Sequence, residues 1–292
     1  MLWRLANPGD AGQLAELTNA TGRTRLTPDE ALRFLAGWSV EIGLVDHEPA
    51  AAVAVLPPTS ESNHRAYGTW WDRRSEAPHH ITTLVQRTVE VARRTRATTL
   101  QFALPVDDRD RIAAVESSGF DTAFPLWTMG HDHETWPAEA PTLPPPLRLE
   151  PWSERLSDSF LAAYVDSYQD QRVVEPHSAK TWCSILAEDG FSATISTLAV
   201  AANDVVVGFV LAFQEARHVE LGPIGTIRSW RGRGVSTALL DHALLSCRQR
   251  LIATVGLTVD GESPTGAHRL YLTHGFTVTE SLMAYRLDLR RA

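Results

Sequence analysis

A proline-rich segment near the middle of the chain constrains the fold more than any other sequence feature. The stretch from Trp136 to Pro151 has the sequence WPAEAPTLPPPLRLEP, and its prolines lack backbone N–H groups and favour extended polyproline geometry. It divides the 292 residues into two halves, each of a length typical of one domain. We therefore expect a first domain over residues 1–135, a linker over 136–146 and a second domain over 147–292.

The second half contains alternating stretches typical of strands and helices. Apolar residues recur at helical spacing in residues 153–169, and Asn203-Asp204 forms a hairpin-type turn between two apolar runs. The expected elements, in chain order, are a strand at 147–149, helices at 153–169 and 178–187, strands at 195–201, 205–213 and 218–228, a helix at 235–250, a strand at 254–259, a helix at 267–274 and a strand at 283–289.

The first half repeats this order of elements. Its expected elements are a strand at 2–6, helices at 11–19 and 28–37, strands at 40–45, 51–56 and 66–71, a helix at 81–96, a strand at 99–104, a helix at 110–117 and a strand at 124–129. An order that repeats after about 150 residues indicates a duplication. We expect two tandem α/β (α+β) domains, each a mixed, mostly antiparallel sheet flanked by helices.

Composition narrows the functional classes. The formal net charge of −8 argues against a broad nucleic-acid surface, which needs a basic face, and is compatible with an amine substrate. The two cysteines, Cys183 and Cys247, provide neither a disulfide framework nor a cysteine-based zinc site. No apolar run is long enough for a membrane span, and the first residues lack the pattern of a signal peptide. These features predict a cytoplasmic protein without a membrane partner.

A glycine-containing loop lies between the expected strand at 218–228 and the helix at 235–250. Two glycines let the backbone turn tightly and approach a ligand, and the following helix presents its first-turn N–H groups and positive dipole end. Such a loop suits a pyrophosphate, although it is neither a Walker loop nor GxGxxG. Its residues are Arg231, Gly232, Arg233, Gly234, Val235 and Ser236.

With this loop in place, the second half resembles the GNAT (Gcn5-related N-acetyltransferase) superfamily. The family carries (Q/R)-x-x-G-x-(G/A) directly after its fourth strand, and residues 231–236 lie in that register. A second similarity lies downstream, where the strand end 257–260 and the loop 263–267 lead into 270–276, which resembles A-x-x-L-Y-x-x-x-G-F. The resemblance covers almost the whole second half and extends in layout to tandem members such as mycothiol synthase.

The resemblance implies acetyl-CoA or another acyl-CoA as co-substrate, and no metal. Gly222-Pro223 suits a bulge that splays two strands apart, although Pro223 could merely end one strand and start another. Ser263 replaces a common asparagine, so one amide contact with the cofactor is lost. The residues implied in coenzyme A binding are Ile224, Gly225 and Thr226, which pair through their backbone with the pantetheine arm, then Arg231, Gly232, Arg233, Gly234, Val235 and Ser236 around the pyrophosphate, and Ser263.

Two residues match catalytic positions of the family. Tyr271 matches a tyrosine near the thioester sulfur, where a phenol can donate a proton to the leaving thiolate, and its alternative is a tyrosine in the core. Glu220 matches the general base of some members, since the attacking amine must be neutral, and it could instead contact the substrate. His218 and Glu215 are weaker substitutes for Glu220. Direct attack in a ternary complex is implied.

The acceptor is expected to be the primary amine of a small molecule. In the family the first helices of the domain shape the acceptor pocket, so the candidate wall is Tyr164–Trp182 together with the cleft between the domains. The same aromatic side chains could belong to the core. The candidate residues are Tyr164, Tyr168, Glu175, His177 and Trp182.

We expect the first half to retain the scaffold without the chemistry. Its counterpart of the loop, residues 70–78, has no glycine but has two carboxylates that repel an anion. Val115 stands where the other copy has Tyr271, so we expect no coenzyme A here. Trp70 and Trp71 pack in the core or line a substrate cleft. Solvated histidines are the expected state of the pairs at 79–80 and 131/133, rather than a metal site.

Three functions remain open on the sequence. The leading one is an N-acyltransferase that moves an acetyl or other acyl group from coenzyme A to a small-molecule amine. The second is an acyl or aminoacyl transferase with another donor, such as aminoacyl-tRNA, against which the acidic balance argues. The third is a non-catalytic acyl-CoA-binding regulatory protein on the same scaffold. The identity of the amine and the oligomeric state are not encoded in any motif.

Overall fold

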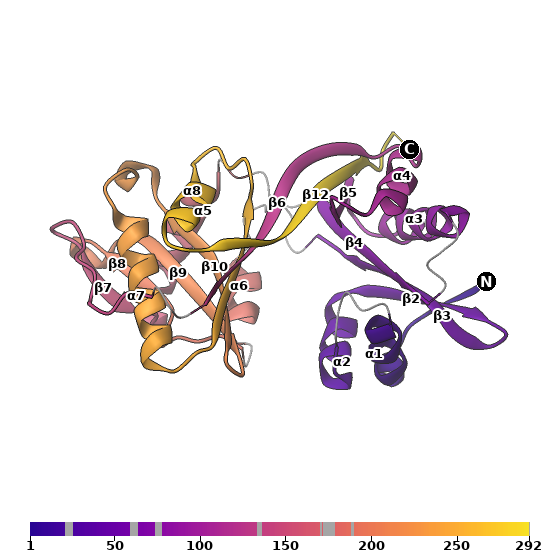
Figure 1. Ribbon diagram of the computed structural model, residues 1–292, viewed down its shortest axis with the longest axis horizontal. Helices are drawn as coiled ribbons and strands as arrows, with labels where there is room; N and C mark the ends of the chain where they lie inside the picture. The colour runs from indigo at the N-terminus through magenta and orange to yellow at the C-terminus, as the bar shows by residue number, and fades with distance from the viewer. Residues whose placement is uncertain are drawn as a thin grey trace. The chain divides into compact units, whose positions relative to one another are not determined.

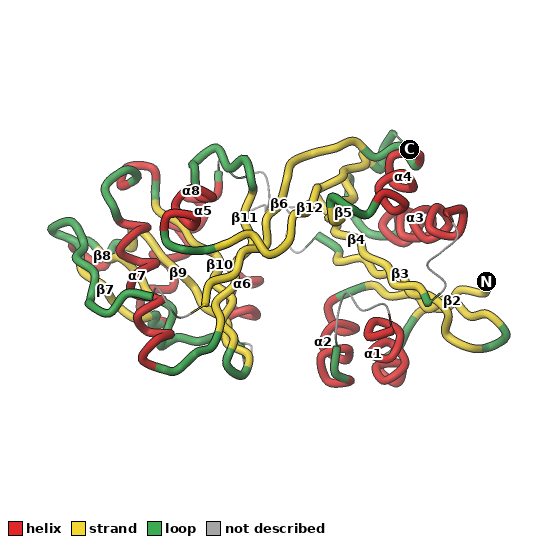
Figure 2. The backbone as a smooth tube through the Cα atoms, viewed as in Figure 1, coloured by secondary structure: helices red, strands yellow, loops and turns green. Residues whose placement is uncertain are grey.

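The chain forms two compact units in a computed structural model (Figure 1). The structure describes residues 1–20, 26–58, 64–73, 78–132, 136–169, 171, 179–187 and 190–291. One unit consists of Met1–Ala123 together with Leu282–Ala292, and the other of Phe124–Ser281. Each unit contains strands with helices packed on them (Figure 2).

The first unit is built on a sheet with the strand order β1-β2-β3-β4-β5-β12. Neighbouring strands are antiparallel except for the parallel pair of β4 and β5. The N-terminus of α2 is fixed by a capping box between Thr27 and Glu30, with Pro28 in the first turn. The elements are β1 (Leu2–Leu5), α1 (Ala11–Ala20), α2 (Pro28–Gly37), β2 (Ser39–Val45), β3 (Glu48–Leu56), β4 (Arg65–Asp72), α3 (Pro78–Arg93), β5 (Thr99–Pro105) and α4 (Arg109–Ser117).

The second unit has the strand order β12-β6-β11-β10-β9-β8-β7. The pair β10–β11 is parallel, whereas β7–β8, β8–β9, β9–β10 and β6–β11 are antiparallel. The elements are β6 (Asp121–Asp132), β7 (Arg148–Pro151), α5 (Ser157–Tyr168), α6 (Ala179–Leu186), β8 (Thr197–Val200), β9 (Val206–Glu215), β10 (His218–Thr226), α7 (Val235–Gln249), β11 (Thr254–Asp260), α8 (Ala267–Thr273) and β12 (Thr277–Asp288).

The order of elements is the same in both halves, as the sequence predicts. Each half runs through strand, two helices, three strands, helix, strand, helix and strand. The expected turn at Asn203-Asp204 is present, and both residues have positive φ, 56° and 59°, as in the tight turns that asparagine and aspartate tolerate. The fold class expected from the sequence, tandem mixed sheets flanked by helices, is confirmed.

The last strand of each half completes the sheet of the other unit. Leu126–Asp132 of β6 pair with β11 in the second unit, and Leu282–Asp288 of β12 pair with β5 in the first. The compact units therefore differ from the expected domain boundaries at both ends of the second half. The segment expected as a linker also contributes to the second unit, because Trp136 and Leu143 are buried in its core.

Two helical layers enclose the sheet of the second unit. Residues of α7 and α8 form one core cluster with Val255, Leu257 and Met129, while residues of α5 and α6 form another cluster with Phe209 and Leu211 on the opposite face. Because side chains alternate between the faces of a strand, the residues between these positions on β6, β10 and β11 face away from α7 and α8.

The parallel strands β10 and β11 separate part-way along their length. They pair only at His218–Glu220 with Thr254–Gly256, although β11 remains paired with β6 as far as Asp260. The register of β10 against β9 shifts between Leu221 and Ile224, which places the irregularity at Gly222-Pro223. The expected bulge and splayed strand pair are therefore confirmed.

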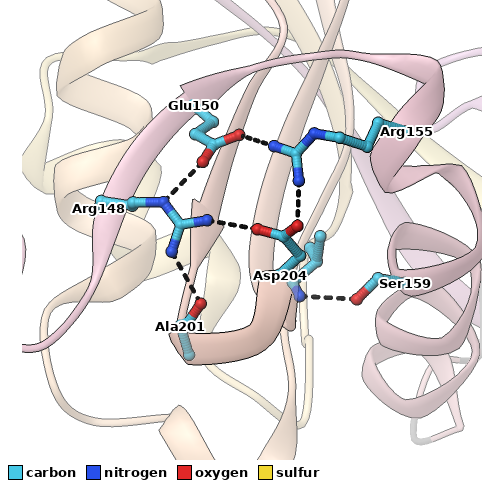
Figure 3. Close-up of polar contacts among 7 residues, drawn as sticks. Arg148, Glu150, Arg155, Ser159, Ala201 and Asp204 are labelled. Carbon is cyan, nitrogen blue, oxygen red and sulfur yellow. Dashed lines mark hydrogen bonds and ion pairs between the residues drawn. The ribbon is translucent and has the colours of Figure 1, made fainter.

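An ion-pair network at the surface joins β7 to the turn after β8 (Figure 3). Arg148 contacts Glu150 and Asp204, each at 2.6 Å, and donates to the Ala201 carbonyl at 2.9 Å. Arg155 contacts the same two carboxylates. The network links the first strand of the second half to its sheet, on the side of the unit away from the separation of β10 and β11.

The side chains of Trp70, Trp71 and His131 are all buried. Trp70 and Trp71 are 2% and 4% exposed in the first unit, so the core alternative is confirmed for both. The expectation of a solvated His131 is wrong, because its ring is buried against Trp136 and Phe276. The alternation of β6 explains this burial, since His131 shares a face with Met129. His133 and the side chain of residue 79 lie outside the described part of the chain.

Candidate active site

A central cavity of about 300 Å³ lies where β10 and β11 separate. Its walls come from α5, α6, β10, β11 and α8, so the two helical layers meet at this point. The side chains and backbone that line it belong to Tyr164, Tyr168, Gln171, Trp182, Glu220, Leu221, Gly222, Pro223, Ile224, Leu257, Thr258, Val259, Asp260, Ser263, Ala267 and Tyr271. The structure thus brings together both expected catalytic residues and three of the expected acceptor residues.

Glu220 is the last residue of β10 before the strands separate. Its carboxylate faces the central cavity, with 46% of the side-chain area exposed, and lies 3.7 Å from His218 Nε2. Desolvation by the surrounding protein raises its pKa from 4.5 to about 7. A carboxylate with this pKa can accept a proton from an ammonium group near neutral pH.

The position of Glu220 depends on a glycine in the neighbouring strand. Gly256 pairs directly with Glu220, and a Cβ atom at Gly256 would lie 2.5 Å from Glu220 Oε2 and 3.1 Å from His218 Cε1. His218 in turn shares a 2.9 Å hydrogen bond with Thr254 Oγ1. Only glycine at 256 therefore leaves room for the glutamate and histidine side chains over β11.

Tyr271 reaches the central cavity from α8, on the other face of the sheet. Its side chain is 6% exposed, and burial raises the pKa of its phenol. The phenol therefore keeps its proton at neutral pH, which is the form that can donate. Tyr271 belongs both to the core cluster and to the cavity wall, so its core packing and its expected role in the site are compatible.

A second cavity of about 170 Å³ continues from the central one toward the glycine loop. We call it the loop-side cavity. Tyr271, Ile224, Gln171 and Ala267 line both cavities. The remaining residues around the loop-side cavity are Ser167, Gly225, Thr226, Arg231, Gly232, Ser236, Thr265, Gly266 and Leu270.

The edge of β10 beside the separation offers backbone groups to a ligand. Ile227 N–H donates to Val207 on β9, so the N–H and C=O groups of Ile224 and Thr226 point to the opposite edge. Arg231 Nε donates to the Thr226 carbonyl at 3.2 Å. Burial raises the pKa of the Tyr168 phenol well above 10.0, and a hydrogen bond from the Ile224 backbone lowers this pKa to a smaller extent.

The glycine loop has the conformation that a phosphate site requires. Gly232 and Gly234 have φ of 71° and 78°, and no atom lies within 4 Å of a Cβ built on either. Gly234 is the N-cap of α7 and supplies no side-chain acceptor for the first-turn N–H groups, which leaves that task to a ligand or solvent. Ser236 Oγ bonds Thr226 Oγ1 at 2.7 Å. The loop fits a pyrophosphate through its backbone.

Two loop arginines have side chains engaged elsewhere. Arg231 donates to the Ser167 carbonyl at 3.0 Å, and Arg233 stacks its guanidinium over Trp230 at 4.9 Å from the ring centroid. Arg228 N–H also donates to Asp166 at 2.8 Å. The end of α5 is thereby tied to the segment that carries the loop, and the expected role of the Arg231 backbone is compatible with these side-chain bonds.

The expected acceptor residues fall into two groups. Tyr164 and Trp182 are 1% and 5% exposed, pack against each other at 5.0 Å and still line the central cavity, so they are both core and wall. Tyr168 stacks near Tyr164 at 4.7 Å. Glu175 and His177 lie outside the described residues. Ser263 is buried at the cavity wall and shares a 3.0 Å hydrogen bond with Thr265.

Nothing in the sequence points to the residues of β6 as part of the site. Thr128, Gly130 and Asp132 face the same side of the sheet as Glu220 and line a third cavity beside it. The sequence predicts these residues as part of the first domain, because no neighbouring residue indicates that β6 pairs with β11. The alternation in TMGHD and TVGLTV, polar on one face and apolar on the other, is the only signal that could have indicated a polar face there.

Within the described ranges, no group of three or more His, Cys, Asp or Glu side chains could hold a metal ion. Among the described helices, none combines the length and the apolar character needed to cross a bilayer.

Solved structures of GCN5-related N-acetyltransferases share this architecture. A GCN5-related N-acetyltransferase from Sphaerobacter thermophilus is 24% identical, with 99% of this chain and 95% of that chain covered and a TM-score of 0.82. A tandem GNAT protein from the clavulanic acid biosynthesis pathway is 13% identical, with 99% and 98% covered and a TM-score of 0.73. The chain has the fold of a tandem GNAT protein.

A sequence profile agrees with this fold. Residues 135–276, just under half of the chain, match the acetyltransferase (GNAT) family. The match supports acyl transfer in general as the activity of this segment. No curated protein sequence matches the chain.

Proposed function

We propose that the chain transfers an acetyl or other acyl group from coenzyme A to a primary amine of a small molecule, by direct attack. The observation that carries this proposal is that Glu220 and Tyr271 line one cavity from opposite faces of the sheet, at the point where β10 and β11 separate. A proton acceptor and a proton donor on either side of one reacting carbon are what aminolysis of a thioester requires.

The donor is proposed to occupy the loop-side cavity and the edge of β10. Backbone N–H groups of residues 231–236 hold the pyrophosphate at the start of α7, where the helix dipole favours an anion. The pantetheine arm pairs with the Ile224 and Thr226 edge as an added strand. Ser263 and Thr265 lie close by, at the walls of the two cavities.

The chemistry follows from the two side chains. Glu220 takes the proton of the acceptor ammonium, so the nitrogen attacks the thioester carbon as a free amine. The C–N bond forms, the nitrogen releases its second proton to solvent, and the C–S bond breaks as the tetrahedral intermediate collapses. Tyr271 donates a hydrogen bond and finally its proton to the leaving sulfur, and solvent restores it. Positioning of the two substrates supplies much of the remaining acceleration.

We propose that the first unit is a copy without this activity. Its strands β4 and β5 also pair in parallel over only three residues, Arg65–Tyr67 with Thr99–Gln101. The register then places Tyr67 and Gln101 where the second unit has Glu220 and Gly256. Beyond this point Trp70 packs on Phe102 at 4.8 Å and fills the space between the strands.

Calorimetric titration with acetyl-CoA tests the proposal. We expect one site per chain, lost in Gly234→Val, where a side chain would block the loop. Gly119→Val is the matched control, because Gly119 also has a positive φ of 87° but lies in the first unit. Two sites would assign a second working site to the first unit. No binding would contradict acyl-CoA as the donor and would make aminoacyl-tRNA the next donor to measure.

A further inference from the structure

A cavity of about 450 Å³ lies on the face of the second unit's sheet away from α7 and α8. We call it the sheet-face cavity. Glu220 lines both this cavity and the central one, so a molecule in the sheet-face cavity reaches the carboxylate that is proposed to act as base. The volume lies in the range of small-molecule sites. Its lining residues are Thr128, Met129, Gly130, His131, Asp132, His218, Glu220, Thr254, Val255, Gly256, Gly275, Thr277 and Thr279.

Two glycines hollow the floor of this cavity next to Glu220. Gly256 pairs with Glu220 on one side and with Gly130 on the other, so the three residues form one row across β10, β11 and β6. A Cβ at Gly130 would lie 3.0 Å from Thr279 Cγ2. The absence of two side chains lets the Glu220 carboxylate lie over Gly256 and the Thr279 methyl group lie over Gly130, at the floor of the cavity.

Asp132 and Glu220 are the two carboxylates among the described residues that line the sheet-face cavity, and His218 lies 3.7 Å from Glu220. Asp132 lies in the neighbouring row, opposite Thr254, which itself pairs with His218. Two strand spacings and two residues separate Asp132 from Glu220, roughly 12 Å between Cα atoms. None of the described residues that line the cavity is Arg or Lys. The side chains of Met129 and Val255 point into the core, so the lining is small and polar.

We propose that the sheet-face cavity binds the acceptor and selects a compact diamine or polyamine. One nitrogen lies at Glu220, loses its proton and is acylated. A second ammonium group stays charged and pairs with Asp132. An acceptor that also carries a carboxylate or phosphate is disfavoured, because it would face two carboxylates without an arginine or lysine to pair with. This inference rests on the proposed acyl transfer.

Three matched amines test the proposal on the full chain with acetyl-CoA and a thiol-release assay. 1,4-Diaminobutane has the second ammonium, n-butylamine lacks it, and ornithine adds a carboxylate to the same diamine. We expect kcat/KM for 1,4-diaminobutane to exceed that of each of the other two by about 2- to 5-fold, the worth of one exposed ion pair. Equal values, or a preference for ornithine, would overturn the proposal.

Two variants assign the preference to its residue. Asp132→Asn should reduce kcat/KM for 1,4-diaminobutane to that of n-butylamine and leave n-butylamine unchanged. Glu280→Gln is the control, because Glu280 is an exposed carboxylate on β12 next to Thr279 and points to the opposite face. If both variants behave alike, Asp132 does not hold the second ammonium and the proposal is wrong.

Failure of this inference and failure of acyl transfer give different results. Thiol release with amines of another class, with acetyl-CoA bound, would refute the diamine selectivity and leave the acyl transfer standing. No thiol release with any amine and no heat of binding with acetyl-CoA would refute both.

Discussion

Gly256 and Glu220 lie side by side at the last paired position of β10 and β11, and the glutamate carboxylate occupies the space of the missing side chain. A Cβ at residue 256 would lie 2.5 Å from Oε2, but the clashing atom is the end of a flexible side chain. Gly256→Ala therefore should displace Glu220 at little cost in stability. We expect kcat to fall by about 10- to 100-fold, less than the roughly 100- to 10,000-fold cost of losing a general base, because the carboxylate is displaced and not removed, with the melting temperature nearly unchanged.

Steady-state kinetics and thermal melting check this prediction together. Gly12→Ala in α1 is the control, since no atom lies within 4 Å of a Cβ there and alanine favours a helix. It should keep full activity. A large loss of stability in Gly256→Ala, or unchanged kcat, would show that the position of Glu220 does not depend on this glycine.

The pH dependence of the rate should report the pKa of Glu220. Desolvation raises that pKa to about 7, and the base works only when deprotonated. We expect kcat/KM to rise with pH through about 7 and then to follow only the titration of the amine. His218, at 3.7 Å, is the other titratable group beside it. In Glu220→Gln the rise of kcat/KM near pH 7 should disappear. If the rise persists in this variant, it belongs to His218 and not to Glu220.

The same pKa has a consequence for stability. A carboxyl with a folded-state pKa above 4.5 binds its proton more tightly in the folded chain, so it stabilises the fold at low pH and loses this effect as the pH rises through about 7. Glu220→Gln should therefore gain melting temperature relative to the parent between pH 4.5 and 7. If the melting temperatures of Glu220→Gln and the parent differ by the same amount at every pH, the raised pKa of Glu220 is contradicted.

Tyr271→Phe removes the donor and keeps the ring. We expect kcat to fall by roughly 100-fold, while the Kd for acetyl-CoA changes little, because the ring packing near Phe276 is retained. Calorimetry and pre-steady-state thiol release measure the two effects separately. A variant with full kcat would return Tyr271 to a purely structural role.

Tyr168→Phe should have the opposite effect on binding. In the structure its phenol bonds to the Ile224 backbone, which lies on the edge proposed for the pantetheine arm. Loss of the hydroxyl releases that group, and one hydrogen bond is worth about 1 kcal/mol. We expect the Kd for acetyl-CoA to fall about 3- to 5-fold. Weaker binding would place the arm away from Ile224.

The sequence predicted local features better than long-range ones. The glycine loop, the irregularity at Gly222-Pro223 and the order of elements are encoded by neighbouring residues, through glycine conformation, proline geometry and hydrophobic period. The meeting of Glu220 with Tyr271 followed only from family resemblance. Residue spacing alone does not show that two strands separate and admit a side chain from the opposite helical layer.

The full lengths and the pairing partners of β6 and β12 could not be predicted from the sequence. Both strands continue further than their apolar patterns suggested, since Thr277–Ser281 is largely polar and exposed. The partner of a strand is set by backbone hydrogen bonds, to which every residue contributes equally. Nothing in the side chains of Leu126–Asp132 therefore distinguishes pairing with β11 from pairing within the first half. Asp132 and Gly130 were missed for this reason.

The exchange of β6 and β12 also affects the order of events during synthesis. The first unit lacks a strand until Leu282–Asp288 have left the ribosome, because these residues pair with β5. At about 5–20 residues per second, translation of the intervening residues 124–281 takes roughly 10–30 s. During that time β5 has an open edge, which is a site for mispairing with other chains. The nascent chain is thus most exposed to aggregation before Leu282–Asp288 are made, and a chain that stops before Leu282 leaves the first unit without its last strand.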